Sequence, residues 1–127
     1  MHTMKNNSIK RILIVDDNDS NLFAMSAILS ALGVSVITAK NGKIGIDILL
    51  EDDSIDLVFM DIMMPVMDGY QAITEIRTIH HLTTPIIALT AKAMAGDMEK
   101  CMSAGANDYC AKPVQIDDIR DKVRSYT

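Results

Sequence analysis

Residues 56–70, DLVFMDIMMPVMDGY, decide the fold class of this 127-residue chain. The apolar run Leu57–Met60 is typical of a strand that is buried on both faces of a sheet. It stops at the carboxylate of Asp61, yet Ile62–Met64 are apolar again before Pro65. Residues 62–65 are too apolar to form a well-solvated loop. The carboxylate of Asp61 is therefore expected to be held at the end of a central strand and not in an ordinary surface turn.

Four more apolar, mostly β-branched runs lie around this strand, and segments with helical periodicity separate them. This alternation predicts an α/β fold of right-handed βαβ units, in which helices cover both faces of a parallel sheet. The predicted strands are Ile12–Val15, Val34–Thr38, Asp56–Met60, Pro85–Leu89 and Asp108–Ala111. The predicted helices are Ser20–Leu32, a helix capped by Asn41 that ends near Glu51, Asp68–Thr78, Met94–Ala104 and Val114–Tyr126.

The apolar positions of these helices recur every three or four residues, which predicts the face that each helix turns to the sheet. The residues expected to point inward are Leu22, Met25, Ile28, Leu29 and Leu32, then Ile44, Ile48 and Leu49, then Tyr70, Ile73 and Ile76, then Met98, Cys101 and Met102, and finally Ile116, Ile119 and Val123.

The composition limits the class of protein. With 12 basic and 17 acidic residues the net charge is −5, which argues against a protein that binds nucleic acid directly. Cys101 and Cys110 form no disulfide framework and predict reduced thiols in a cytoplasmic domain. No apolar run reaches the roughly 20 residues of a membrane span, so no membrane contact by this domain is expected. Residues 1–8 are expected to be a loose leader, and residues 9–127 a single domain.

Polar residues stand where the predicted strands end. Asp16 and Asp17 follow the first strand, Asp61 ends the third, Thr90 ends the fourth, and Lys112 follows the fifth. If the strand order is 2-1-3-4-5, the three carboxylates lie together at the edge of the sheet where ligands bind. Like charges so close repel each other unless a cation lies between them, which predicts a Mg²⁺ site that meets a phosphoryl group. Asp61 would be the nucleophile, with Lys112 and Thr90 on the phosphoryl oxygens.

The stretches ILIVDDND, DLVFMDIMMPVMDG, IIALTA and DYCAKPV identify a resemblance. From about Ile9 to Arg124 the chain resembles the receiver domain of two-component response regulators. Within that family, VDDNDSN and AKPV resemble the receivers of hybrid histidine kinases. The resemblance implies a flavodoxin-like fold, in which (βα)5 units form a five-stranded parallel sheet in the order 2-1-3-4-5.

The resemblance also assigns roles. It implies that Asp61 accepts a phosphoryl group from a phosphohistidine on a partner, and that Mg²⁺ is required, with Mn²⁺ able to substitute. Asp17 and Asp61 would bind the metal directly, Asp16 through water, and Met63 through its backbone carbonyl. The other implied site residues are Thr90 through its hydroxyl, Ala91 through its backbone amide, Lys112 as the charged partner of the phosphate, and Tyr109 as an aromatic switch. A cis bond between Lys112 and Pro113 is expected as well.

The implied partner is a histidine kinase dimerisation domain or a histidine phosphotransfer protein. The helix Ser20–Leu32 carries Phe23 and Ala27 outside its core stripe, which fits either a docking patch for that partner or a helix packed more deeply. A homodimer through the last helices is a further possibility. Met63 and Lys92 occupy positions that tune the lifetime of the phosphoryl group in this family, and they predict slow to moderate self-hydrolysis.

Other functions stay open at this point. The chain is expected to be part of a hybrid sensor histidine kinase, and that longer protein is expected to be membrane-anchored. A free-standing single-domain response regulator is the alternative. A non-phosphorylated structural interaction module is a third interpretation. A dehalogenase-type phosphatase also uses an Asp nucleophile, but it needs a second acid where Met63 stands. The domain is no enzyme in the usual sense, since its reactions are self-phosphorylation from small donors and self-dephosphorylation.

Overall fold

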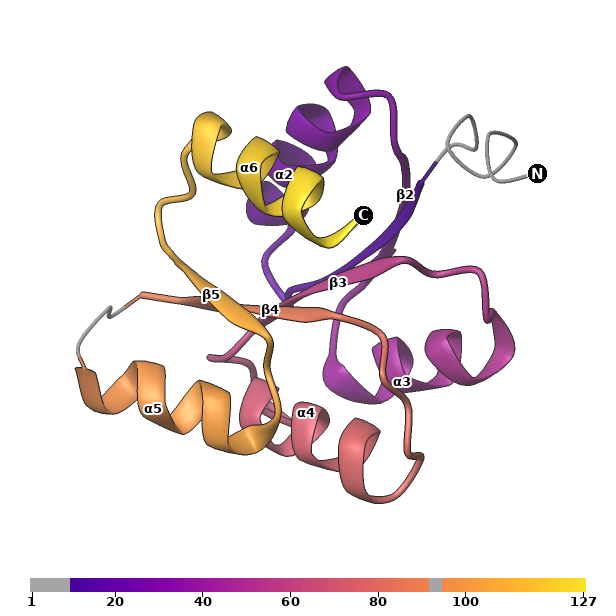
Figure 1. Ribbon diagram of the computed structural model, residues 1–127, viewed down its shortest axis with the longest axis vertical. Helices are drawn as coiled ribbons and strands as arrows, with labels where there is room; N and C mark the ends of the chain where they lie inside the picture. The colour runs from indigo at the N-terminus through magenta and orange to yellow at the C-terminus, as the bar shows by residue number, and fades with distance from the viewer. Residues whose placement is uncertain (1–9, 92–94) are drawn as a thin grey trace.

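The computed structural model describes residues 10–91 and 95–127. The predicted leader, residues 1–8, and the positions Lys92 and Met94 lie outside that part. Strands and helices alternate along the described residues (Figure 1). In chain order they are β1 (Arg11–Val15), α2 (Asp19–Ala31), β2 (Ser35–Ala39), α3 (Gly42–Glu51), β3 (Leu57–Asp61), α4 (Gly69–Thr78), β4 (Ile86–Thr90), α5 (Ala95–Ala104), β5 (Asp108–Ala111) and α6 (Ile116–Tyr126).

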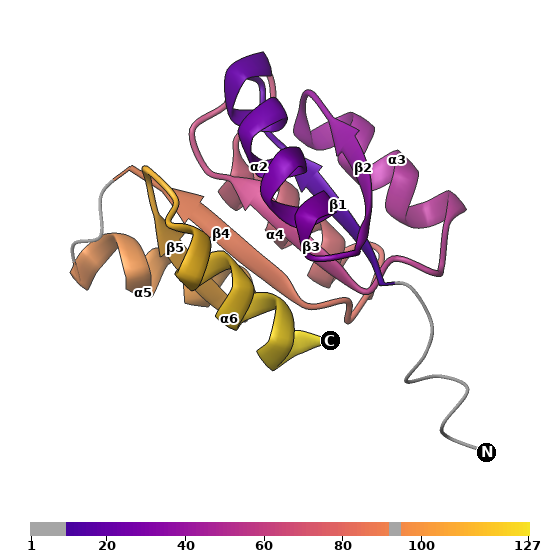
Figure 2. The same ribbon diagram turned by 90° about the horizontal axis from the view of Figure 1, so that it is seen from above.

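The five strands form one parallel sheet in the order β2-β1-β3-β4-β5. Helices α2 and α6 cover one face, whereas α3, α4 and α5 cover the other (Figures 1 and 2). The predicted flavodoxin-like architecture is therefore confirmed. Strands β1 and β3 are neighbours although α2, β2 and α3 lie between them in sequence, and Val15 pairs with Met60 at their carboxyl ends. The strand order thus reverses between β1 and β3, where ligands bind in such sheets.

Two hydrophobic clusters, one on each face of the sheet, hold the layers together. Alternate residues of the central strands supply both clusters, with Leu57 and Phe59 facing α2 and α6 and Val58 and Met60 facing the other three helices. All four side chains are fully buried. This burial explains the unbroken apolar run in the sequence, since neither face of β3 meets water.

Three of the side chains expected to point inward are exposed instead. Ile44 is 44% exposed and Ile116 is 60% exposed, and both lie in the first turns of their helices, α3 and α6. Met102 is 46% exposed because the helical step of about 100° per residue turns it away from the sheet when its neighbour Cys101 is fully buried. The predicted start of the last helix at Val114 was also wrong, since α6 begins at Ile116.

Side chains cap three helices at the edge of the sheet where the strands end. The side chains of Asn18, Asn41 and Asp68 accept hydrogen bonds from the backbone amides of the third residue beyond each of them. Such caps satisfy amides that have no partner inside the helix. They fix α2, α3 and α4 close behind the strands that precede them, and so set the loops that surround the candidate site.

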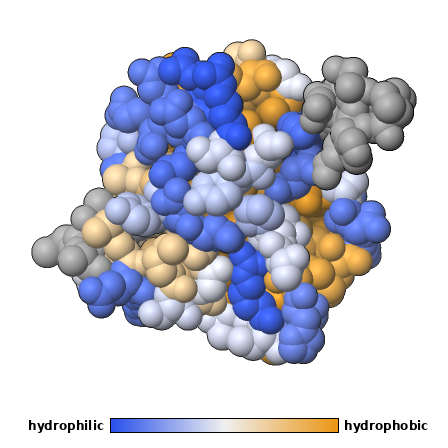
Figure 3. Space-filling model, viewed as in Figure 1, coloured by the Kyte–Doolittle hydropathy of each residue, from blue (hydrophilic) through white to orange (hydrophobic). Residues whose placement is uncertain are grey.

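The surface mixes polar and apolar residues. On the face shown in Figure 3, hydrophobic patches are separated by hydrophilic residues. The largest exposed apolar side chains include Phe23, Met63 and Val66, which are 77%, 72% and 89% exposed. None of the helices in the described ranges combines the length and apolar character that a membrane crossing requires.

Candidate functional site

The carboxylates predicted at the strand ends come together at one edge of the sheet. Asp16 follows β1, and Asp61 is the last residue of the neighbouring strand β3. Asp16, Asp17 and Asp61 each place a carboxylate oxygen within 4.8 Å of those of the other two. Asp16 and Asp61 are almost fully buried, at 1% and 2% exposure, whereas Asp17 is exposed. Two buried carboxylates and an exposed one thus share a small volume.

Lys112 supplies a positive charge to this cluster. It follows β5, two strands away from β3, and its Nζ lies 2.9 Å from Asp61 Oδ1 and 3.4 Å from Asp16 Oδ2. The backbone amide of Lys112 donates to the carbonyl of Thr90 at 2.8 Å, which holds the base of the side chain against β4. The bond between Lys112 and Pro113 is cis, as expected.

The electrostatics of the cluster favour an added cation. Burial raises the pKa of the Asp61 carboxyl above its usual value, and the charge of Asp16 raises it further, although the hydrogen bond from Lys112 acts the other way. Burial alone would lower the pKa of Lys112, but its contacts with Asp61 and Asp16 raise it, so Lys112 stays charged. One ammonium group therefore faces two buried carboxylates.

Oxygen ligands in this arrangement suit a hard divalent cation. Mg²⁺ is usually bound by one or two carboxylates and keeps several waters. The three carboxylates fit this requirement, because their oxygens are close together and Asp17 opens to solvent. Such an ion would also offset the repulsion between Asp16 and Asp61.

The loop after β3 is held tightly at both ends. The amide of Met63 donates to Asp61 Oδ1 at 3.3 Å, and the amide of Gly69 donates to the Ile62 carbonyl at 2.9 Å. Between them, the amide of Met67 donates to the Pro65 carbonyl at 2.8 Å across Val66. Val66 has a φ of +70°, which is a strained conformation for a β-branched residue.

Glycine at position 69 lets α4 begin directly against the backbone of Asp61. A Cβ at Gly69 would lie 2.4 Å from the Asp61 carbonyl oxygen and 2.7 Å from the Cα of Ile62. No side chain fits there without movement of the backbone that carries the carboxylate. Glycine is therefore required at position 69 of the stretch 56–70 for a steric reason.

The remaining predicted residues lie on the β4 and β5 side of the site. Thr90 is buried at the end of β4, and Ala91 follows it at the surface. Both border a cavity of about 260 Å³, which is also lined by Met63, Tyr70 and Lys100. Tyr109 is half-buried in β5 and packs against the hydrophobic cluster under α3, α4 and α5.

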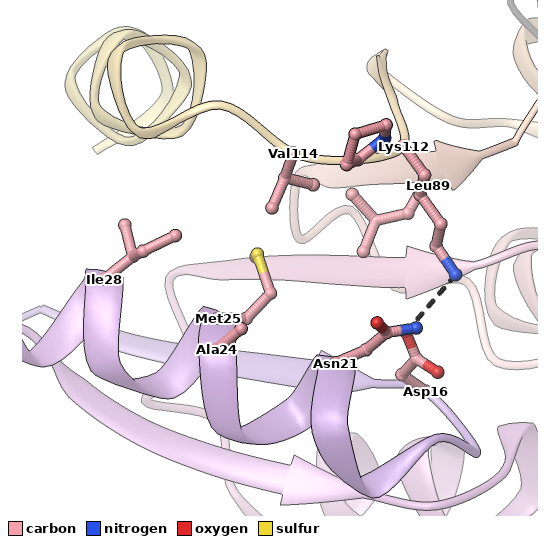
Figure 4. Close-up of a pocket in the computed structure, with 9 residues that line it drawn as sticks. Asp16, Asn21, Ala24, Met25, Ile28, Leu89, Lys112 and Val114 are labelled. Atoms are coloured by element: carbon pink, nitrogen blue, oxygen red, sulfur yellow. Dashed lines mark hydrogen bonds and ion pairs between the residues drawn. The ribbon is translucent and has the colours of Figure 1, made fainter.

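A second cavity, of about 200 Å³, lies between α2 and the turn after Lys112 (Figure 4). Asp16, Asn21 and Lys112 form its polar end, and the apolar side chains that line it include Met25 and Val114. In Figure 4 the side chain of Asn21 points toward this polar end. Asn21 was not predicted as a site residue, although its spacing from Met25 places both on one face of the helix.

The exposure of Phe23 argues against one interpretation of α2, a helix that is packed more deeply. It lies on α2 and is 77% exposed, so this helix is not packed deeply enough to bury it. An exposed aromatic side chain and an apolar cavity thus belong to the same helix, next to the acidic cluster.

Comparison with known proteins gives a consistent result. The family model described as the response regulator receiver domain matches residues 12–124. Hybrid signal transduction histidine kinase G of Dictyostelium discoideum is 42% identical over 121 residues. That match covers 91% of this chain but only 4% of the kinase, so the chain spans a small part of this relative's length.

Two solved receiver domains are similar to this chain both in fold and in sequence. The receiver domain of sensor histidine kinase PA1611 from Pseudomonas aeruginosa PAO1 superposes with a TM-score of 0.83 at 36% identity, over 94% of this chain and 98% of that one. Its structure has a magnesium ion coordinated in the active site cleft. The receiver domain of the Saccharomyces cerevisiae response regulator Ssk1, crystallised with the histidine phosphotransfer protein Ypd1, gives a TM-score of 0.85 at 30% identity, over 93% of this chain and 88% of that one.

Proposed function

This chain belongs to the response regulator receiver domain family, and from that premise we propose that Asp61 accepts a phosphoryl group from a phosphohistidine of a partner protein. The observation that carries the proposal is the environment of Asp61, a buried carboxylate at a strand end, bonded to Lys112 and close to two further carboxylates. A purely structural module would have no need of this cluster, since buried like charges are costly.

Mg²⁺ is the metal that the donor set fits, and Mn²⁺ is expected to replace it. Asp16, Asp17 and Asp61 would hold the ion together with the backbone carbonyl of Met63. When bound, it supplies positive charge beside the carboxylates and the phosphoryl oxygens. The magnesium ion in the PA1611 receiver supports this assignment.

The chain's own residues account for the transfer. A carboxylate oxygen of Asp61 attacks the phosphorus, while the bond from phosphorus to the imidazole nitrogen of the partner breaks. Lys112 loses part of its contact with Asp61 and pairs instead with a phosphoryl oxygen. The Thr90 hydroxyl and the Ala91 amide hold the remaining two oxygens, so that each of the three phosphoryl oxygens has one donor. Hydrolysis of the acyl phosphate later restores Asp61.

The output of the domain is a shift between two conformations. The phosphoryl group draws Thr90 inward, and Tyr109, two strand positions away from the pairing partner of Thr90, takes up the space that this movement frees. Tyr109 is half-buried and packs against the hydrophobic cluster under α3, α4 and α5, so an inward movement would bury it further.

A partner with a helical surface fits beside the site. Phe23 is exposed on α2, and on another side of the same helix the cavity of about 200 Å³ ends at Asp16 and Lys112. A kinase dimerisation domain or a histidine phosphotransfer protein would place its phosphohistidine over Asp61 from this side. The complex of the Ssk1 receiver with Ypd1 supports a phosphotransfer protein as the partner class.

The relatives favour a place in a longer protein. The kinase G match is a hybrid histidine kinase of which this chain spans a small part. We therefore propose that the domain serves a hybrid kinase in a phosphorelay, and a single-domain regulator is the alternative. Transfer from a phosphorylated histidine phosphotransfer domain to the purified chain, followed by phosphate-affinity electrophoresis, tests the proposed function.

Phe23→Asp is expected to slow transfer from that phosphotransfer domain by roughly tenfold, because the few interface residues whose loss costs more than about 1 kcal/mol of binding are enriched in large aromatic side chains. Phosphorylation by acetyl phosphate, which needs no docking surface, should change little. Leu50→Asp is the matched control, since Leu50 is 51% exposed on α3. Equal transfer rates for wild type and Phe23→Asp with every donor would contradict the docking surface.

A further inference from the structure

We propose that Met63 is a site of reversible oxidation by peroxides, and that its sulfoxide shortens the lifetime of the phosphoryl group on Asp61. The second half rests on the proposed function. Oxidation would then act as a redox input to the phosphorylation site itself.

Met63 has the most exposed side chain among the methionines of the described residues. It is 72% exposed, whereas Met25, Met60 and Met64 are exposed by 8% or less. Met102, on α5, is the other strongly exposed one at 46%. A peroxide must reach the sulfur from solution, so Met63 should react well before the buried residues.

The position of Met63 ties its side chain to the site. Its own amide donates to Asp61 Oδ1 at 3.3 Å, which links the backbone of Met63 directly to the phosphoacceptor carboxylate. Its side chain borders the cavity of about 260 Å³ that also includes Thr90 and Ala91. Because Met63, Thr90 and Ala91 line one cavity, we infer that a polar atom added to this side chain can reach the groups proposed to hold the phosphoryl oxygens.

The reaction needs only the thioether and a peroxide. The sulfur lone pair attacks one oxygen of hydrogen peroxide, the O–O bond breaks, an S–O bond forms and water leaves after proton transfer. The sulfur loses two electrons and the peroxide gains them. Methionine sulfoxide reductases reverse the change at the expense of thiols.

Oxidation replaces an apolar group by a strong hydrogen-bond acceptor. The unmodified thioether cannot hold a water molecule in line with the bond between Asp61 and phosphorus, whereas a sulfoxide oxygen accepts a hydrogen bond from such a water. Lys100 lines the same cavity, with its Nζ 4.3 Å from the centroid of the Tyr70 ring, and adds a positive charge to the surroundings of this sulfoxide. One added hydrogen bond to the attacking water corresponds to a roughly two- to tenfold faster hydrolysis.

The test compares wild type, Met63→Leu and Met102→Leu, each with and without hydrogen peroxide that is removed before the assay. Peptide mapping by mass spectrometry locates the sulfoxides. Each sample is then phosphorylated with acetyl phosphate and Mg²⁺, the donor is removed, and the decay of the adduct is followed by intact mass. Each variant is compared with its own untreated sample, so that the substitution alone does not enter the ratio.

Met63 is expected to oxidise before Met25, Met60 and Met64, and the adduct of oxidised wild type to decay two- to tenfold faster. Met102→Leu should respond like wild type, Met63→Leu should not respond, and methionine sulfoxide reductases should restore the original lifetime. If Met63 stays unmodified, or if the lifetime is unchanged when Met63 is fully oxidised, this inference is overturned while the proposed function stands. A chain that acquires no adduct from any donor contradicts the proposed function and this inference with it.

Discussion

Replacing Lys112 with Met is expected to slow phosphoryl transfer to Asp61 by a factor of roughly one hundred to one thousand, the usual effect of removing one positioned donor from a site where charge develops. Lys112 lies 2.9 Å from Asp61 Oδ1 and is the cation within hydrogen-bond distance of both buried carboxylates in the described part of the chain. Methionine keeps the length and apolar stem of the side chain but removes the charge. The rate is measured with acetyl phosphate and Mg²⁺.

Lys122→Met is the matched control for this experiment. Lys122 is also half-buried and paired with a carboxylate, since its Nζ lies 2.9 Å from Asp108 Oδ2. This pair lies at the start of β5, away from Asp61. The control should therefore keep a transfer rate close to that of wild type. Similar losses in both variants would show that Lys112 acts through the stability of the fold rather than at the site.

Gly69→Ala is expected to lower the free energy of unfolding by about 1–3 kcal/mol and to slow phosphorylation as well. The added Cβ would lie 2.4 Å from the Asp61 carbonyl oxygen, so either the start of α4 or the end of β3 must shift. A shift of β3 moves the carboxylate relative to Lys112, and small misplacements of a reacting group reduce rates strongly. Urea denaturation and the acetyl phosphate assay measure the two effects.

Gly96→Ala provides the comparison for Gly69→Ala. Gly96 also lies in the first turn of a helix, α5, but a Cβ there would meet nothing within 4 Å. Alanine should therefore stabilise the protein by about 0.4–1 kcal/mol, because it restricts the unfolded chain. If Gly69→Ala were as harmless as Gly96→Ala, the close approach of α4 to Asp61 would have no energetic importance.

One physical rule made both the sheet and the carboxylate cluster at its edge predictable from the sequence. Residues of parallel strands that are far apart in sequence end at the same edge, so the order of the strands decides which ends are neighbours. The buried run before Asp61 marked a central strand, and the pairing of β1 with β3 placed Asp16 beside it. The positions of Asp61 and Lys112 followed from the same argument.

The periodicity of apolar residues was less informative about which side chains of a helix are buried, because that depends on how the helix packs against the sheet. It placed Ile44, Met102 and Ile116 inward, although all three are exposed, because the rotation of a helix against a sheet depends on contacts that the pattern does not contain. It places Asn21 on the same face of α2 as Met25, but it does not show that the turn after Lys112 lies across from Asn21 and closes a cavity there. The turn at Val66 was not predicted either, because a positive φ is expected at glycine and this position holds a β-branched residue.

The most direct test of the account is the intact mass of the purified chain after incubation with acetyl phosphate and Mg²⁺. The account predicts a gain of one phosphoryl group that is lost in base, that is absent in Asp61→Asn and that does not form when a chelator removes the metal. A chain that gains no phosphoryl group from acetyl phosphate or from any phosphohistidine donor would contradict the account, and so would an adduct that persists in Asp61→Asn.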